Sequence, residues 1–363
     1  MTKSHPGPRL SRSDAASPSP YRLGQAWLQF WFSPSDPVGL HVLRLLTGLI
    51  LVAWLLPLAA NGEALFGLGG WFDRQAFREA ARLEGGPPQP LTWSVLYLCG
   101  SNAVLLRMAG GLAVIVFALF ALGVWPRVTA ALTWVLVASF SGSPFLVGDA
   151  DPLLLILTLY LMIGYGLVGL GDHDQPLVRR LLGPRDTWLL GRRSAGGPAV
   201  RESVAANLAL RLIQVHVAIL MVVGGLRKLQ YGEWWGGTAL WHVLHPAAEL
   251  TPAQIGTPAQ VHTSLIGLGL ATYAVLAWQI GFPGFSWRPR WRPVLLGGAL
   301  LAWLACALIY HVPIYGPALC VACLSYVSSG EWCRFFAQLA KLPALARVAR
   351  PAQLRYPEVK PKM

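Results

Sequence analysis

The sequence predicts an all-α membrane protein, a transmembrane bundle of about eight helical spans with both termini in the cytoplasm. Three observations lead to this fold class. Of the 363 residues, 55% are hydrophobic and 12% are charged, with a mean hydropathy of +0.50, whereas a soluble domain carries about 25% charged residues. The apolar residues form blocks of about 20, the length that spans about 30 Å of hydrocarbon. The basic residues lie mainly between these blocks, where they orient membrane helices.

Eight apolar blocks are predicted to be spans. The first follows Ser35-Asp36-Pro37, a capping residue before a proline at a helix start. The last two are separated by His311-Val312-Pro313, where the proline favours a turn but one long kinked helix would also fit. The predicted spans are Val38–Ala59, Ala103–Val124, Arg127–Val147, Pro152–Leu170, Ala205–Leu229, His262–Ile280, Pro293–Tyr310 and Val312–Ser328.

The charges between the spans predict the orientation. With eight spans, the basic stretches all fall on one side: the N-terminal tail, the loop 171–204, the loop between the sixth and seventh spans, and the C-terminal segment. The other side holds Asp149, Glu233 and the loop 61–102, in which acidic and basic residues balance. Because basic loops stay in the cytoplasm, we expect a multi-pass protein of the cell (inner) membrane with both ends inside.

Three regions follow from this organisation. Residues 1–34 are rich in serine, proline and basic residues, too long and polar for a signal-peptide n-region, and are predicted to be a disordered cytoplasmic tail. Residues 35–329 form the transmembrane domain. Residues 330–363 are predicted to be an amphipathic, basic cytoplasmic segment, which would lie on the leaflet or bind a partner. In the extracytoplasmic loop, Phe77–Leu83 is expected to form a short amphipathic helix.

Charge and cysteine usage exclude several functions. The net charge of +13 is explained by the loops, so no nucleic-acid partner is expected. Cys320 and Cys323 form a C-x-x-C, but no second pair or histidine cluster completes a zinc site. The spacing of His242, His245 and His311 matches no metal motif, so no metal is expected. Membrane lipids are the expected partners, and protein partners are not indicated.

The fifth span carries the most informative polar residues, because ionisable groups at membrane depth are costly. At 100° per residue, Gln214, Gly225 and Lys228 fall within about 40° of one line, and Arg227 lies on roughly the opposite face. Lys228 either extends its ammonium to the lipid headgroups or has a functional role. The glycine- and tryptophan-rich segment that follows, which includes Trp234, is expected to be reentrant or tightly packed.

Three further polar residues are candidates for the site. Asp151 precedes a proline at a helix start, so it is either an N-cap or a partner for Lys228 or a polar ligand. Arg44 lies inside the first span, and His311 heads the last one. On the predicted orientation, Lys228, Asp151 and His311 belong to the outer side, which is therefore the expected working side.

The chain resembles the HTTM (horizontally transferred transmembrane) family, which is related to the vitamin K-dependent gamma-glutamyl carboxylases. The resemblance runs from about Ser35 to Ser329 and rests on the order and spacing of several short motifs. These motifs are Arg44-Leu-Leu-Thr-Gly48, Ser143-Pro144…Gly148…Asp151-Pro-Leu-Leu, Leu212…Gln214…Gly225-Leu-Arg-Lys228-Leu…Trp234…Gly237-Thr-Ala239, and His311.

In the carboxylases, a lysine in a Gly-x-Lys-Lys-Leu segment is implicated as the base that acts on reduced vitamin K. The resemblance places Lys228 there, with Arg227 replacing the first lysine, and implies a quinone or quinol as the cofactor. Two differences matter. An Asn-His pair of the carboxylases is replaced by Ser141, Gly142 and Ser143, and their large extracytoplasmic domain has no counterpart here. The resemblance therefore does not imply peptide carboxylation.

Three functions follow as alternatives. An enzyme would carry out a quinol- or lipid-linked reaction in an outward-facing cavity with Lys228 as the base. A transporter would use the same buried charges along a path to the cytoplasmic face, through Arg211, Arg44 or His41. A non-catalytic protein would bind a lipid or scaffold a partner, with Lys228 in a structural role. The sequence indicates neither the substrate nor the oligomeric state.

Overall fold

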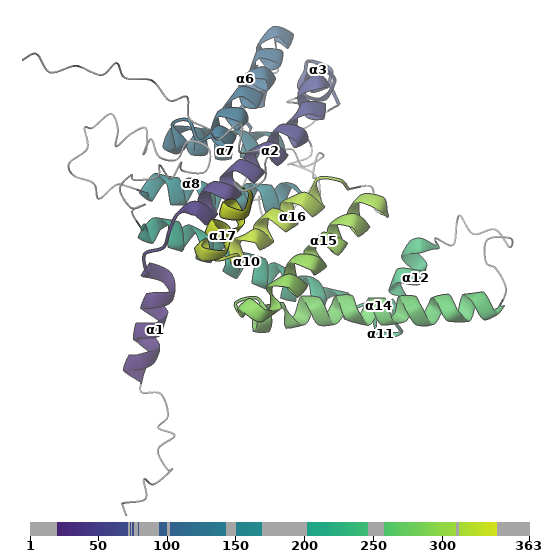
Figure 1. Cartoon of the computed structure of the whole chain (residues 1–363). Coiled ribbons are helices and arrows are strands. Elements are labelled where there is room, and N and C mark those ends of the chain that lie inside the picture. Colours follow the sequence, from purple (N-terminus) through teal and green to yellow (C-terminus); the bar gives the residue numbers. More distant parts are fainter. Residues whose placement is uncertain are drawn as a thin grey trace, which may run out of the picture.

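The structure, a computed structural model, is helical wherever it describes regular elements, apart from one isolated bridge between Ser35 and Ser203. The all-α prediction is thereby confirmed for the described part of the chain. Long helices form a bundle, and short helices lie at its ends (Figure 1). The described residues are 20–71, 73, 75, 79, 94–99, 102–142, 150–168, 202–245, 258–309 and 312–339.

Each of the eight apolar blocks contains a helix. Five helices in the described ranges are long and apolar enough to cross a membrane, and α8 and α16 are shorter apolar helices. The chain is therefore a multi-pass helical membrane protein, while the number of eight crossings stays a prediction. The helices are α2 (Val38–Ala60), α6 (Ala103–Leu122), α7 (Pro126–Ser141), α8 (Asp151–Leu167), α10 (Val204–Lys228), α14 (Pro258–Phe285), α15 (Arg292–Leu308) and α16 (Tyr315–Cys323), which the 3-10 helix η3 (Leu324–Tyr326) continues.

The starts of α2 and α10 are joined side by side. The backbone N–H of Ser203 donates to the carbonyl of Ser35 at 2.9 Å, and the reverse bond is 3.2 Å long. The side chain of Ser203 also caps α10 by accepting from the N–H of Ala206, as N-cap serines do. We call the end of the bundle where α2 and α10 begin the basal end, and the end where they finish the far end.

Close packing of small residues holds the bundle together. A Cβ atom on Gly48 of α2 would lie 2.6 Å from the Cβ of Ala121 on α6, and one on Gly164 of α8 would lie 2.7 Å from the Cβ of Ala209 on α10. Small residues let membrane helices approach closely where apolar burial alone gives no driving force. The interior between α2, α6, α8 and α10 is filled by buried apolar side chains.

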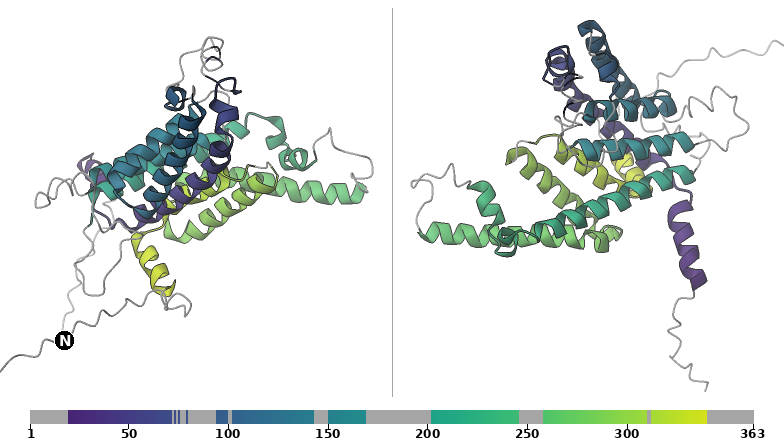
Figure 2. Two further views of the ribbon diagram at one scale, coloured as in Figure 1. Left: turned by 90° about the horizontal axis from the view of Figure 1, so that it is seen from above. Right: turned by 180° about the vertical axis from the view of Figure 1, so that it is seen from behind.

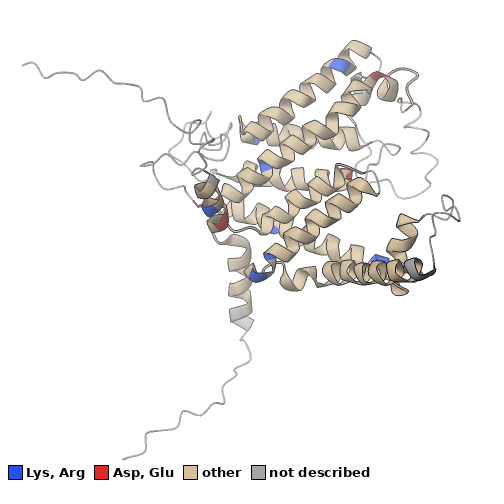
Figure 3. Cartoon of the chain, turned by 45° about the vertical axis from the view of Figure 1, so that its right-hand side comes forward, with Lys and Arg blue, Asp and Glu red and all other residues tan. Residues whose placement is uncertain are grey.

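The outer surface of the bundle is apolar. Four large apolar side chains on the long helices are each more than 60% exposed: Met108, Leu270, Leu301 and Leu308. Their exposure is unfavourable in water but favourable in hydrocarbon. Charged residues are sparse on these helices (Figure 3). The distribution matches a bundle whose sides face lipid.

Short helices lie at both ends of the bundle. At the far end lie α3, α5, α11 and α12, and at the basal end lie η2 and α17. The predicted amphipathic C-terminal segment contains α17, while its residues 340–363 lie outside the described residues. The helix predicted at Phe77–Leu83 also lies outside them, apart from Glu79. The bounds are α3 (Gly62–Phe66), α5 (Leu96–Cys99), α11 (Gly232–Trp235), α12 (Ala239–Leu244), η2 (Pro289–Trp291) and α17 (Ser329–Leu339).

One helix lies in the tail that was predicted to be disordered. Helix α1 (Pro20–Phe32) leaves the bundle at the basal end and turns away from the axis of α2 (Figures 1 and 2). The side-chain amide of Asn207 donates to the carbonyls of Phe30 and Trp31, both at 3.0 Å, and so fixes the end of α1 to α10. Of the tail 1–34 that was predicted to be disordered, residues 20–32 are therefore helical, and residues 1–19 lie outside the described residues.

Candidate functional site

Lys228 ends α10 and lies against Trp234. Its ammonium is 5.3 Å from the centre of the Trp234 ring, within the range of a cation–π interaction. Trp234 belongs to α11, whose last residue is Trp235. The Trp235 indole donates to the carbonyl of Leu229, and the Trp235 backbone carbonyl accepts from the hydroxyl of Tyr273 at 2.7 Å. Helix α11 is therefore clamped between the end of α10 and α14. Of the predicted site residues, the structure brings Lys228 and Trp234 together.

Two neighbours of Lys228 take different environments. Gly225 is buried where α10 crosses α14, and a Cβ there would lie 2.9 Å from Cγ1 of Ile280. Arg227 is exposed, while Lys228 is half-buried. The predicted separation of Arg227 and Lys228 onto different faces therefore appears in the structure as a difference in burial.

Asp151 lies in the first turn of α8 and is buried. Its Oδ1 accepts a hydrogen bond from the indole N–H of Trp54 at 3.0 Å. The N-cap position of α8 is Ala150, so Asp151 stands one residue inside the helix and acts as a first-turn acid rather than as the cap. The structure gives Asp151 a tryptophan of α2 as a partner, and its pairing with Lys228 stays a prediction.

Gln214 lies far from Lys228 although both share one stripe of α10. The two residues are about 21 Å apart along the axis at a rise of about 1.5 Å per residue. The Gln214 amide donates to the carbonyl of Ser325 at 2.7 Å and accepts from Arg211 and Trp287 at 2.9 and 3.2 Å. Gln214 thus joins α10 to η3 and to Trp287, which follows α14, near the basal end.

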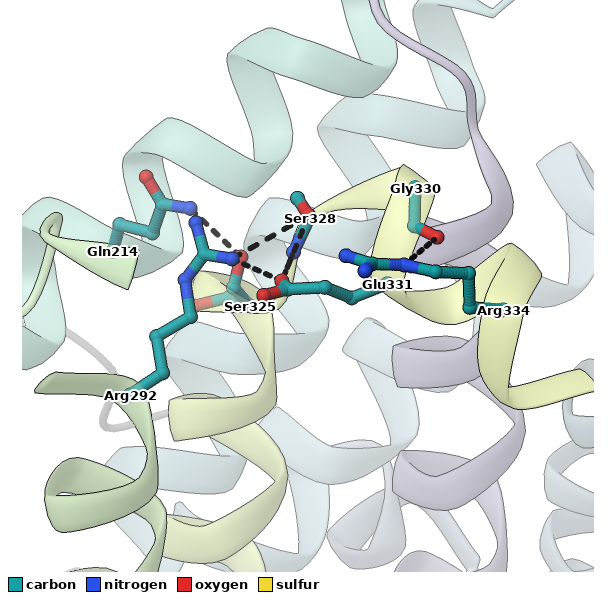
Figure 4. Close-up of polar contacts among 7 residues, drawn as sticks. All are labelled: Gln214, Arg292, Ser325, Ser328, Gly330, Glu331 and Arg334. Carbon is teal, nitrogen blue, oxygen red and sulfur yellow. Dashed lines mark hydrogen bonds and ion pairs between the residues drawn. The ribbon is translucent and has the colours of Figure 1, made fainter. Parts of the chain in front are cut away.

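An ion pair lies beside Gln214 at the basal end (Figure 4). Arg292 at the start of α15 pairs with Glu331 in α17, and the Glu331 carboxylate also accepts from the N–H and hydroxyl of Ser328 at 2.8 and 2.7 Å. Partial burial raises the pKa of Glu331, but these hydrogen bonds and the Arg292 charge outweigh it and lower the pKa. The sequence had shown Arg292 only as a loop charge, because its partner comes from a distant segment.

A second buried polar group lies on α2 near the basal end. The Nδ1 of His41 is 2.7 Å from the hydroxyl of Tyr165 on α8, and Nη1 of Arg44 donates to the same hydroxyl at 3.3 Å. Arg44 is 0% exposed. Arg44 was a predicted site residue, whereas Tyr165 was missed, since a lone tyrosine in an apolar block gives no signal until α2 and α8 are known to pair. The structure separates Arg44 from Lys228, which lies at the far end.

A shallow hollow lies between α8, α10 and α16. Its lining is apolar except for Tyr160 and His216, whose hydroxyl and Nδ1 are 3.3 Å apart. Its enclosed space of about 10 Å³ is about what a single water molecule needs, so this hollow is too small for a ligand. The predicted outward-facing cavity stays a prediction, and His311 and residues 143–149 lie outside the described residues.

Together these features define a multi-pass helical membrane protein with buried polar groups at both ends of its bundle. Comparisons of the chain with family models, with curated proteins and with solved structures each found no match.

Proposed function

We propose that this membrane protein binds the polar head of a membrane-resident amphiphile, a lipid or a quinone, at Lys228 and Trp234. The observation that carries the proposal is the half-buried ammonium held 5.3 Å from the centre of the Trp234 ring where α10, α11 and α14 meet. A cation beside a tryptophan at the end of a span suits a polar head whose apolar part lies along the helices. The resemblance to the HTTM family supports a quinone as one such molecule.

The geometry favours binding over catalysis. A tryptophan face stabilises the protonated ammonium, whereas a general base must be neutral when it accepts a proton. A quinol-linked enzyme with Lys228 as its base is therefore the second candidate. A transporter is less favoured, because the residues of α10 between Gln214 and Lys228 are apolar except for His216 and the exposed Arg227.

We also propose that all eight helices cross the cell (inner) membrane with the far end outside. The support is the distribution of charge: Arg127, Arg290 and Arg334 belong to the basal end, and Glu233 follows α10 at the far end. Basic residues are retained on the cytoplasmic side. The proposed amphiphile would thus be bound in the outer half of the bilayer.

The amphiphile is tested by extracting the purified full-length protein and quantifying lipids and quinones by mass spectrometry. Lys228→Ala is expected to lose at least about tenfold of one co-purified species, the loss that corresponds to about 1.4 kcal/mol of binding free energy. Arg227→Ala is the matched control, since it removes an adjacent but exposed charge, and it should retain that species. Equal amounts in the wild type and Lys228→Ala would refute the proposal.

Lys228→Arg separates the two candidates. Arginine keeps the cation over Trp234 but cannot serve as a base, because it stays protonated. Retention of the amphiphile by Lys228→Arg supports binding through charge. Loss of a quinol-dependent turnover in Lys228→Arg, with the quinone still bound, would instead establish the catalytic candidate.

A further inference from the structure

The guanidinium of Arg44 is enclosed by the protein and only partly used. Arg44 lies in the second turn of α2 and is 0% exposed. Its Nη1 donates to Tyr165, but its Nε and Nη2 have no hydrogen-bond partner among the described residues. These two N–H groups lie on one edge of the planar guanidinium. That edge is the one that binds an oxyanion through two parallel hydrogen bonds.

The neighbours of Arg44 leave its charge uncompensated. Arginine only donates, so the Tyr165 oxygen accepts from Arg44, and Nδ1 of His41 shares a hydrogen bond of 2.7 Å with the same hydroxyl. An imidazole is neutral or positive whichever tautomer it adopts, so His41 does not offset the guanidinium charge. The chain of hydrogen bonds from Arg44 through Tyr165 to His41 therefore contains the positive charge of Arg44 and no negative one.

Two buried or partly buried carboxylates of the bundle serve other groups. Asp151 accepts from Trp54, about 15 Å further along α2 by helix rise, and Glu331 pairs with Arg292. In the described part of the chain, Arg44 has no ion pair. The hydroxyl of Thr47, one turn from Arg44 on the same face of α2, is also fully buried without a hydrogen-bond partner.

An unpaired charge at this depth is strongly unfavourable, and an oxyanion would supply both the opposite charge and the two missing acceptors. We infer that the Nε–Nη2 edge of Arg44, which the helices enclose in this structure, binds a phosphate group when the helices part at the basal end, with Thr47 as a neighbouring hydroxyl. This inference is independent of the proposed function at Lys228, which lies at the opposite end. Two sources carry the same chemistry, the headgroup of an anionic phospholipid and inorganic phosphate.

The test compares melting temperatures of the full-length, delipidated protein in a sugar-based detergent. Inorganic phosphate, phosphatidylglycerol and the zwitterionic phosphatidylcholine are added separately. One of the two anionic probes should raise the wild-type melting temperature in a saturable manner. A rise with phosphatidylglycerol alone assigns a lipid headgroup, and a rise with inorganic phosphate assigns a free anion.

The melting temperatures of Arg44 variants are compared with that of the wild type, with and without the probe. Arg44→Met removes an uncompensated buried charge, so without a probe it should melt above the wild type, and the probe should no longer raise its melting temperature. Arg44→Lys keeps the charge but not the paired donors and should show a smaller rise. Arg107→Met is the matched control, since Arg107 is an exposed residue paired with Glu63, and it should keep the full rise.

Three outcomes would overturn the inference. One is an absence of stabilisation by either anionic probe, and another is an equal rise in Arg44→Met. The third concerns Asp172 and Asp174, two acids outside the described residues. If Asp172→Asn/Asp174→Asn loses stability and the wild type shows no probe effect, a carboxylate of the chain neutralises Arg44. If Arg44→Met does not fold, phosphorus is quantified in the purified wild type, and a phosphorus-free protein overturns the inference.

Discussion

The indole N–H of Trp54 donates to Oδ1 of Asp151 at 3.0 Å and thereby joins α2 to the first turn of α8. Both residues are buried. Trp54→Phe keeps a ring against Phe140, whose ring centre is 6.2 Å from that of Trp54, but removes the donor from a buried carboxylate. We expect the free energy of unfolding to fall by about 1–3 kcal/mol, measured by SDS titration in mixed micelles.

Asp151→Asn provides the control for this hydrogen bond. The double variant Trp54→Phe/Asp151→Asn should cost less than the sum of the two single variants, because residues that share one interaction are not additive. Strictly additive losses would show that the bond between Trp54 and Asp151 does not carry the effect.

Gly225 allows α10 to approach α14. A Cβ on Gly225 would lie 2.9 Å from Cγ1 of Ile280 and 3.2 Å from Cβ of Gln279, so Gly225→Ala should lower the free energy of unfolding by about 1–3 kcal/mol through overpacking. Gly224→Ala is the matched control, since its Cβ would meet only Nε2 of Gln279 at 3.9 Å. It should be neutral or stabilise by up to about 1 kcal/mol. Similar losses in both variants would contradict the close approach.

Glu331 should make the basal end sensitive to acid. Its pKa lies below the ordinary value of 4.5, because the hydrogen bonds from Ser328 and the Arg292 charge outweigh partial burial. A depressed folded-state pKa contributes stability that is present above the unfolded pKa and is lost as the pH falls through the folded pKa.

The check is the pH dependence of melting in Glu331→Gln. The melting temperatures of the variant and the wild type should differ near neutral pH and converge as the pH falls below about 4.5, the ordinary pKa of glutamate. A difference that is constant across the whole range would mean that the carboxylate charge contributes nothing.

Gln214 joins three segments through one amide. Gln214→Leu leaves the carbonyl of Ser325 and the indole of Trp287 without their bonds to it, so we expect a loss of about 1–3 kcal/mol in the free energy of unfolding. Gln230→Leu, at an exposed position, is the control and should be nearly neutral. The prediction is wrong if the two variants unfold alike.

Hydropathy predicted where the long apolar helices lie, because a helix that spans hydrocarbon needs an unbroken apolar run of about 20 residues. The first span was predicted as Val38–Ala59, and α2 occupies Val38–Ala60. The sixth was predicted to begin at His262, but α14 begins at Pro258 and runs on through Pro283. Helix α1 was not predicted, and its contact with Asn207 joins residues about 176 positions apart, which the local sequence does not reveal.

The candidate site was less predictable than the fold. Helical periodicity placed Gln214 and Lys228 on one face of α10, but periodicity does not say which partners lie at each level along the helix. Gln214 bonds η3 near the middle of α10, whereas Lys228 contacts Trp234 at its end. Trp234 was found because it follows Lys228 closely in the sequence. Tyr165, in contrast, meets Arg44 only through the pairing of α2 with α8.

We propose that the bundle crosses the membrane with the Lys228 end outside and the termini inside. It is tested by placing single cysteines at exposed positions in a cysteine-free protein, Glu233→Cys beside Lys228 and Arg334→Cys in α17, and labelling intact cells with a membrane-impermeant maleimide. We predict labelling at position 233 in intact cells and at position 334 only after permeabilisation. Labelling of both positions from the same side would contradict this orientation.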